Sequence, residues 1–262
     1  MFFGGIMLFK FIICLIAGAG AGLGTGFAGM SAAAVISPML ITFLDVPAYQ
    51  AVGIALMSDV LASAVSAYTY GKNKNIDIKN GLIMMISVLI FTFVGSFVSS
   101  LVPNTAMGGF SMFMTLLLGI KFIVKPVMTT KEKMLSVSAK KRVVQSIICG
   151  VIIGFICGFI GAGGGIMMLL ILTSVLGYEL KTAVGTSVFI MSFTALTGGI
   201  SHMAIGGFPD VWCLIFCVVS TLVFAQIAAR IANKAEAKVL NRITGIILAV
   251  LGVVLIAVNY LF

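Results

Sequence analysis

Long apolar runs separated by short polar loops are the feature that most constrains this chain. The runs over residues 81–102, 106–124 and 244–262 each hold at most one charged residue. A helix needs about 20 such residues to cross the hydrocarbon core of a bilayer. Charged residues make up only 9% of the chain, whereas about a quarter is usual in soluble domains. The sequence therefore predicts an all-α polytopic membrane protein.

Ten apolar segments are found when the chain is cut at its polar loops. Two of them are short, and each of these follows a glycine-rich stretch. The segments cover approximately residues 2–22, 27–44, 48–70, 80–102, 106–124, 143–160, 165–177, 180–203, 209–231 and 242–261.

The basic residues are concentrated in three loops, which predicts an orientation. These loops are residues 71–79, 125–142 and 230–242, and positively charged loops of membrane proteins remain in the cytoplasm. With all three in the cytoplasm, only Lys10 among the 16 Lys and Arg residues lies on the outer side. We therefore expect a multi-pass protein of the cell membrane. This topology explains the net charge of +9 without a nucleic-acid partner.

The two halves of the chain match each other without a gap when position 18 is aligned with position 150. Ten of the 36 positions from residue 18 to residue 53 are identical to their counterparts in 150–185. Each half has five segments, and an odd number turns the second copy upside down when the basic loops share one side. The prediction is an inverted-topology repeat, the plan of many secondary transporters. Its parts are a first repeat (1–128), a basic cytoplasmic loop (129–142) and a second repeat (143–262).

Each half contains a glycine-rich stretch inside its apolar sequence, "GLGTGFAGMS" at 22–31 and "GFIGAGGGIM" at 158–167. Backbone that leaves the helix at membrane depth is tolerated only beside protein or a polar cavity. We therefore predict broken or re-entrant helices around one shared cavity. The start of the helix after each break offers free amides and the positive end of a dipole, which favours an anion.

The glycines have two interpretations. The four-residue spacing of positions 18, 22 and 26, and of positions 150, 154 and 158, is typical of helix packing. The denser group at 161–165 is too rich in glycine for packing alone, and it predicts a backbone cradle for a ligand, because a missing Cβ allows close approach.

With these features the chain resembles the TauE/SafE sulfite exporter family of anion permeases over nearly its whole length. The resemblance rests on "GAGGG" at 161–165, Pro38 and Leu40 of a Pro-x-Leu element, and "AVGTS" at 183–187. The first half departs from the pattern, with "GMSAA" at 29–33 and "AVGIA" at 51–55. The resemblance implies transport of small anions, such as sulfite, organosulfonates or carboxylates, driven by an ion gradient.

Because the second half preserves the motifs better, we expect most substrate contacts there. The hydroxyls of Thr186 and Ser187 are candidate donors to an oxyanion, although such side chains often bond to their own helix. The predicted substrate-binding residues are Gly29, Ser31, Gly161, Gly163, Gly164, Gly165, Thr186 and Ser187.

Two titratable residues are candidates for proton coupling. Asp59 is the one acidic residue near the centre of a span, where a charge is costly and commonly functional. The alternative is a structural hydrogen bond to Ser58, Ser63 or a neighbouring helix. His202, the single histidine, lies near the outer end of its span and is either a gate or proton relay or incidental.

The leading hypothesis is a secondary active transporter of sulfite or an organosulfonate, driven by a proton or sodium gradient. The alternatives are a passive anion channel, a permease for carboxylates or other sulfur oxyanions, and a non-transporting scaffold. No catalytic cluster or nucleotide-binding loop occurs in the sequence, so neither an enzyme nor a cofactor or metal is expected. A homodimer is an open option.

Overall fold

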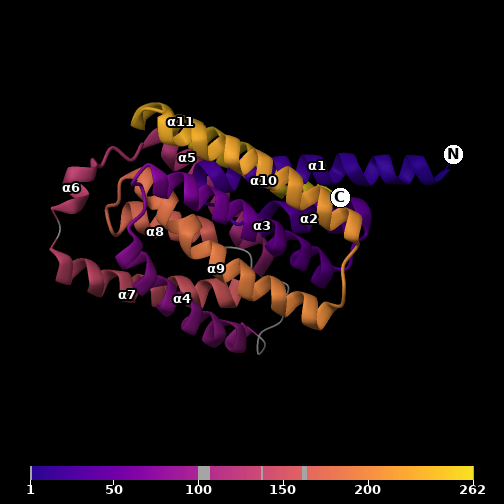
Figure 1. Ribbon diagram of the computed structural model, residues 1–262, viewed down its shortest axis with the longest axis horizontal. Coiled ribbons are helices and arrows are strands. Elements are labelled where there is room, and N and C mark those ends of the chain that lie inside the picture. The colour runs from indigo at the N-terminus through magenta and orange to yellow at the C-terminus, as the bar shows by residue number, and fades with distance from the viewer. Residues whose placement is uncertain (1, 100–106, 137, 161–163, 262) are drawn as a thin grey trace.

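The computed structural model describes residues 2–99, 107–136, 138–160 and 164–261, and within them all regular secondary structure is α-helical (Figure 1). The helices are α1 (Phe2–Ala28), α2 (Ala33–Leu44), α3 (Ala48–Lys72), α4 (Ile78–Ser99), α5 (Met107–Val124), α6 (Lys131–Leu135), α7 (Ala139–Ile160), α8 (Gly164–Ser174), α9 (Leu180–Gly206), α10 (Val211–Lys234) and α11 (Ala237–Leu261).

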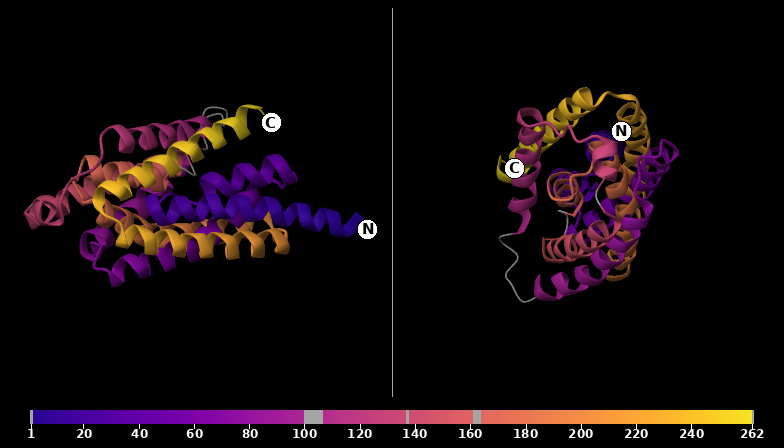
Figure 2. Two further views of the ribbon diagram at one scale, coloured as in Figure 1. Left: turned by 90° about the horizontal axis from the view of Figure 1, so that it is seen from above. Right: turned by 90° about the vertical axis from the view of Figure 1, so that its left-hand side faces the viewer.

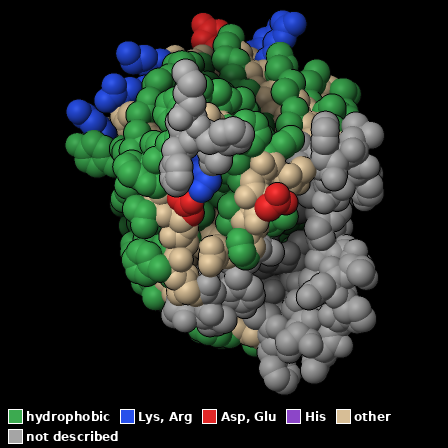
Figure 3. Space-filling view, turned by 90° about the vertical axis from the view of Figure 1, so that its right-hand side faces the viewer, with side chains coloured by type: hydrophobic (Ala, Val, Ile, Leu, Met, Phe, Trp, Pro, Cys, Tyr) green, Lys and Arg blue, Asp and Glu red, His purple; other side chains and the backbone are tan. Residues whose placement is uncertain are grey.

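Among the described residues, five helices are long and apolar enough to cross a membrane. Large hydrophobic side chains cover much of the described surface in Figure 3, and several are strongly exposed, including Phe93 at 76% and Ile16 at 55%. An exterior of this kind suits lipid rather than water. The prediction of a polytopic helical membrane protein is confirmed. The five spans are Met7–Ala28, Gln50–Lys72, Leu180–Ile200, Val211–Lys234 and Ala237–Ala257.

Helices α2 and α8 are too short to cross a bilayer. They have 12 and 11 residues, which gives lengths of about 18 and 16 Å at 1.5 Å per residue, against a hydrocarbon core of about 30 Å. Both bury seven residues, and Figure 2 (right) shows α8 end-on, inside a ring of longer helices. A helix that is hydrophobic all round belongs in such an interior. The segments predicted at 27–44 and 165–177 are therefore internal half-helices.

The main helix contacts join the first half of the chain to the second. Helix α1 packs on α10, α4 on α7, α3 on α9 and α5 on α11. Contacts of this exchanged kind are compatible with an inverted repeat, and both the repeat and its boundaries at 128 and 143 stay predictions. Both chain ends lie at the end of the molecule away from α6 (Figure 2, left).

Glycines allow the backbones of these pairs to approach each other. A Cβ on Gly22 would lie 2.5 Å from the carbonyl oxygen of Thr221 in α10, and one on Gly154 would lie 2.5 Å from that of Val88 in α4. Gly18, Gly26 and Gly150 make similar contacts. The predicted packing role is confirmed for these five, and the surroundings of position 158 lie outside the description.

The contact at Gly22 predicts a stability effect. We expect Gly22→Ala to lower the unfolding midpoint in detergent, because overpacking typically costs about 1–3 kcal/mol. Unfolding is followed with a maleimide dye that reacts with the buried cysteines as they become exposed. Gly5→Ala, in the same helix, is the control, because a Cβ there would have no atom within 4 Å. Equal midpoints for the two variants would contradict the packing role.

The predicted start of the first break is wrong. The first break does not begin at residue 22, since α1 continues to Ala28 and only residues 29–32 leave the helix. The glycines before Ala28 pack against a neighbouring helix, and a continuous helix satisfies their backbone groups within the bilayer. In addition, the basic loop at 125–142 contains the short helix α6, whose first turn is capped by Thr130, which accepts from the backbone N–H of Lys133.

Candidate anion site at the helix breaks

The first break begins where Gly29 ends α1. Gly29 has φ +60°, the left-handed conformation that favours glycine after a helix. Its backbone N–H donates to the carbonyl of Thr25 at 2.9 Å. The chain then turns and enters α2 at Ala33.

Hydroxyl side chains from four helices donate to the carbonyl oxygens of this break. A helix end leaves its last carbonyls without partners, and within the bilayer the protein itself must supply them. The carbonyl oxygens of the first break are therefore satisfied by hydrogen bonds from side chains of the same chain. They are Tyr70 to Gly26 (2.8 Å), Thr244 to Phe27 (3.2 Å), Ser187 to Gly29 (3.2 Å) and Thr25 to Met30 (2.8 Å).

The start of α2 is occupied by the carboxyl of Asp59. Ser31 donates to its Oδ2 at 2.8 Å and Ser63 to its Oδ1 at 2.9 Å, and the backbone N–H of Ala32 also faces it. Asp59 is 1% exposed. The predicted hydrogen bond from Ser63 to Asp59 is confirmed. The alternative bond from Ser58 is wrong, because the Ser58 hydroxyl donates to a carbonyl of its own helix. An acidic group at a helix N-terminus is the arrangement the dipole favours.

The start of α8 lies directly against the first break. A Cβ on Gly165 would be 2.5 Å from the carbonyl oxygen of Gly29 and 2.7 Å from the backbone nitrogen of Ser31. The start of α8 and the first break thus meet, whereas residues 161–163 of the second glycine-rich stretch lie outside the described residues. The repeat alignment pairs Asp59 with Met191, whose Sδ would also lie 2.7 Å from that Cβ. A thioether therefore stands beside α8 where a carboxyl stands beside α2.

The other predicted substrate-binding and coupling residues do not all lie at this contact. Ser187 reaches the first break through its bond to Gly29, whereas Thr186 points elsewhere and accepts from the backbone N–H of Asp77 at 3.0 Å. Gly164 is the first residue of α8. His202 lies in α9, but its side chain falls outside the described residues, as do Gly161 and Gly163.

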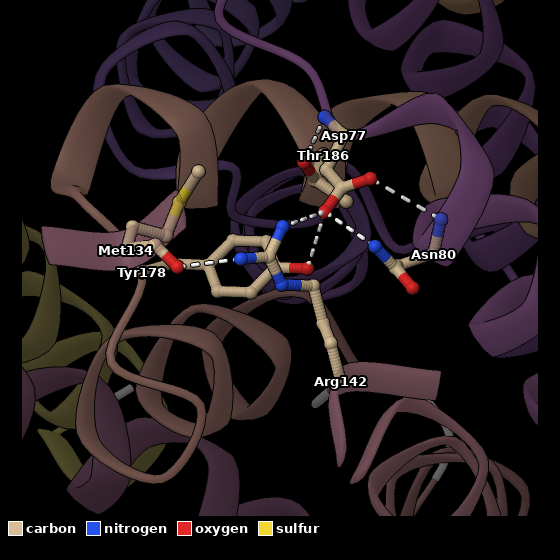
Figure 4. Close-up of polar contacts among 6 residues, drawn as sticks. All are labelled: Asp77, Asn80, Met134, Arg142, Tyr178 and Thr186. Carbon is tan, nitrogen blue, oxygen red and sulfur yellow. Dashed lines mark hydrogen bonds and ion pairs between the residues drawn. The ribbon is translucent and has the colours of Figure 1, made fainter. Parts of the chain in front are cut away.

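A polar cluster around Asp77 has no counterpart in the sequence-based prediction (Figure 4). Tyr178 and the side-chain amide of Asn80 donate to the Asp77 carboxylate at 2.9 and 2.7 Å. Nη1 of Arg142 lies 3.6 Å from it, and Nη2 donates to the carbonyl of Met134 at 2.5 Å. Burial and then the charge of Asp77 raise the pKa of Tyr178, which keeps this hydroxyl a donor.

The repeat alignment contained a signal for this cluster. It pairs Lys10 with Arg142, and it pairs Asp77 with the residue directly before Asp210. Lys10 and Asp210 also form an ion pair, at 2.5 Å, between α1 and the start of α10. Burial disfavours the charged form of Asp210, but hydrogen bonds from Lys10 and from the backbone of Cys213 outweigh it and lower the pKa. The two ion pairs therefore occupy nearly equivalent positions in the two halves.

The three basic loops converge at the end of the molecule that holds this cluster. Lys131 donates to the carbonyl of Lys74, and Asn75 donates to Asn233 at 2.7 Å. Among the described residues, no group of three or more His, Cys, Asp or Glu side chains is arranged to hold a metal ion.

Comparison with known proteins agrees with this architecture. The profile of the family described as Sulfite exporter TauE/SafE matches residues 14–255. The chain is similar to the probable membrane transporter protein YunE of Bacillus subtilis (27% identity, 94% of this chain and 97% of the relative). It is also similar to the probable membrane transporter protein YdhB of the same organism (24% identity, 90% and 96%). A probable membrane transporter protein of Methanocaldococcus jannaschii is 27% identical over 77% of each chain. No solved structure matches. The chain is a multi-pass membrane protein that belongs to the TauE/SafE sulfite exporter family.

Proposed function

We propose that this protein is a secondary active transporter of a small oxyanion, with sulfite or an organosulfonate as substrate and a proton or sodium gradient as the driving force. The family supports anion transport. The observation that carries the proposal is the direct contact between the start of α8 and the first break, where Gly165 meets Gly29 and Ser31.

In this proposal the substrate binds at the start of α8. Two helices begin at the breaks, and the start of α2 already holds the carboxyl of Asp59. Met191 stands in the corresponding position for α8, so the amides from Gly164 onward are the ones that an external anion would meet. The Ser187 hydroxyl lies at the same contact, where it donates to the carbonyl of Gly29, and it would exchange that bond to donate to the anion. The predicted residues Gly161 and Gly163 precede this helix directly and belong to the proposed site.

Asp59 is the proposed coupling residue. An anion at the start of α8 would lie near the Asp59 carboxyl, because Gly165 contacts the residue that donates to it, Ser31. Like charges close together in a low dielectric disfavour each other's ionised form. Binding of the anion therefore favours protonation of Asp59, which links anion movement to proton movement. His202 remains a second candidate, and the converging basic loops are placed in the cytoplasm, as the positive-inside rule predicts.

Flux measurements in proteoliposomes test the proposal. We expect sulfite or methanesulfonate to accumulate against its gradient when a pH or sodium gradient is imposed, and to stop accumulating when an ionophore collapses that gradient. Protein-free liposomes of the same lipid composition give the background leak of the anion. Anion flux that is independent of both gradients would instead support a passive channel. An absence of flux for every anion tried would support a non-transporting scaffold.

A further inference from the structure

We propose that a basic cavity beside α6 is a second, cytoplasmic anion site, and that an oxyanion bound there releases the loop that closes the path to Thr186 and Ser187. The inference rests on the proposed function for the identity of that path. The loop consists of residues 73–77, between α3 and α4, and is called the latch loop below.

The cavity has the size and charge that a small oxyanion requires. Its volume is about 230 Å³, room for several molecules the size of water, each of which takes about 30 Å³ in the liquid. Three cationic side chains and one carboxylate line it, so the charge is unbalanced toward positive. The polar and charged lining residues are Lys74, Lys131, Arg142, Thr182 and Asp77.

The latch loop covers the "AVGTS" element of α9 from this side. The carbonyl oxygen of Asn75 would lie 2.0 Å from a Cβ on Gly185, so this approach needs a glycine there. The next residue, Thr186, accepts from the backbone N–H of Asp77. Thr182, which lines the cavity, is one helical turn before Thr186 and therefore on the same face of α9. The loop thus separates the cavity from Thr186 and from the adjacent Ser187, whose hydroxyl lies at the proposed substrate contact.

The latch loop is held along its length, with Lys131 donating to Lys74 and Asn75 donating to Asn233, and its charged end adds the contacts that an anion in the cavity would disturb. Asp77 holds it to α4, α7 and the turn before α9, through Asn80, Arg142 and Tyr178 (Figure 4). The ion pair with Arg142 is long, at 3.6 Å, whereas a charge-assisted N–H···O bond is usually about 2.7–2.9 Å. Lys74 adds strain, since its φ of +57° is in the left-handed region that side chains disfavour.

An oxyanion in the cavity would compete with Asp77 for Arg142. The guanidinium binds oxyanions through paired donors, and its side chain is 12% exposed, so it is already largely removed from bulk water. The anion would also repel the Asp77 carboxylate, which lines the same cavity. Both effects weaken the attachment of the latch loop, and the strain at Lys74 favours its departure. The site would therefore open the cytoplasmic path only when an anion is present.

Labelling of a reporter thiol tests this proposal without measuring transport. Ser187→Cys is introduced, and its reaction with a membrane-impermeant maleimide is followed in vesicles whose basic loops face outward. Inorganic sulfate and methanesulfonate are the probes, because neither reacts with maleimide. The protein without the reporter gives the background from native cysteines. We expect Asp77→Asn to accelerate labelling about tenfold, equivalent to about 1.4 kcal/mol.

We expect the probes to accelerate labelling severalfold in the Ser187→Cys protein, which is the parent of the other variants. Adding Arg142→Gln to this protein should abolish the probe effect, and adding Arg142→Lys should retain part of it. Lys140→Gln is the matched control: it removes one charge near Arg142 from an exposed residue outside the cavity lining. An equal probe response in Arg142→Gln, or a parent-like rate in Asp77→Asn, would overturn the proposal. If the labelling responses are as expected but the protein without the reporter transports no anion in proteoliposomes, the result would count against the proposed function and not against the anion site.

Discussion

Gly165→Ala is expected to reduce anion uptake at least tenfold while the helices remain assembled. The added Cβ would lie 2.5 Å from the carbonyl oxygen of Gly29 and 2.7 Å from the backbone nitrogen of Ser31. Both are backbone atoms, and the Gly29 carbonyl is also held by the hydrogen bond from Ser187, so α8 must move away from the first break. A displacement of about 1 Å at a functional site can cost about two orders of magnitude in rate.

Initial uptake rates in proteoliposomes, together with the unfolding midpoint in detergent, measure this effect. Gly198→Ala in α9 is the matched control, because the nearest atom to its Cβ, at 3.1 Å, is the end of the flexible Leu56 side chain. Normal uptake by folded Gly165→Ala protein would show that the contact between α8 and the first break is not part of the proposed site.

Asp59→Asn is expected to abolish accumulation driven by a pH gradient but to preserve exchange of anions across the membrane. The amide has a similar shape and can still bond to Ser31 and Ser63, so the break is retained, but it carries no exchangeable charge. Asp59→Ala is expected to be worse, because each buried donor left without a partner costs about 1–3 kcal/mol.

Parallel measurements of net uptake and of counterflow distinguish these outcomes. Ser58→Ala provides the control in the adjacent position, since the Ser58 hydroxyl bonds only to its own helix in the hydrogen bonds described. If Asp59→Asn still accumulates anion against its gradient when the pH gradient is imposed, protons are carried by another residue.

The general architecture could be predicted because it follows from local properties of the sequence. Apolar length determines which segments are helical in a bilayer, and the short segments after each glycine-rich stretch became α2 and α8. The position of the first break was harder to predict. Glycine inside α1 has two meanings, packing or interruption, and only the location of α10 shows that Gly22 packs and Gly29 turns.

The polar contacts depended on long-range geometry and were predicted less well. The bond from Ser63 to Asp59 spans one helical turn and could be anticipated, whereas that from Ser31 joins two helices. Asp77 and Arg142 are both in basic loops whose charges are sufficiently explained by topology, so neither was distinguished as a partner of the other. Their pairing became visible only when α4 and α7 were found in contact.

The glycine contacts between helices also restrict how the molecule can move. Transporters built from inverted repeats commonly rock one repeat against the other. Here the close backbone contacts at Gly22 and Gly154 cross from one half to the other, so rotation of residues 1–128 as a body would separate α1 from α10 and α4 from α7 together. The closely packed units are therefore the cross-half pairs, and if the proposed transport proceeds by alternating access, the displacements would occur between pairs, with the short helices α2 and α8 between them.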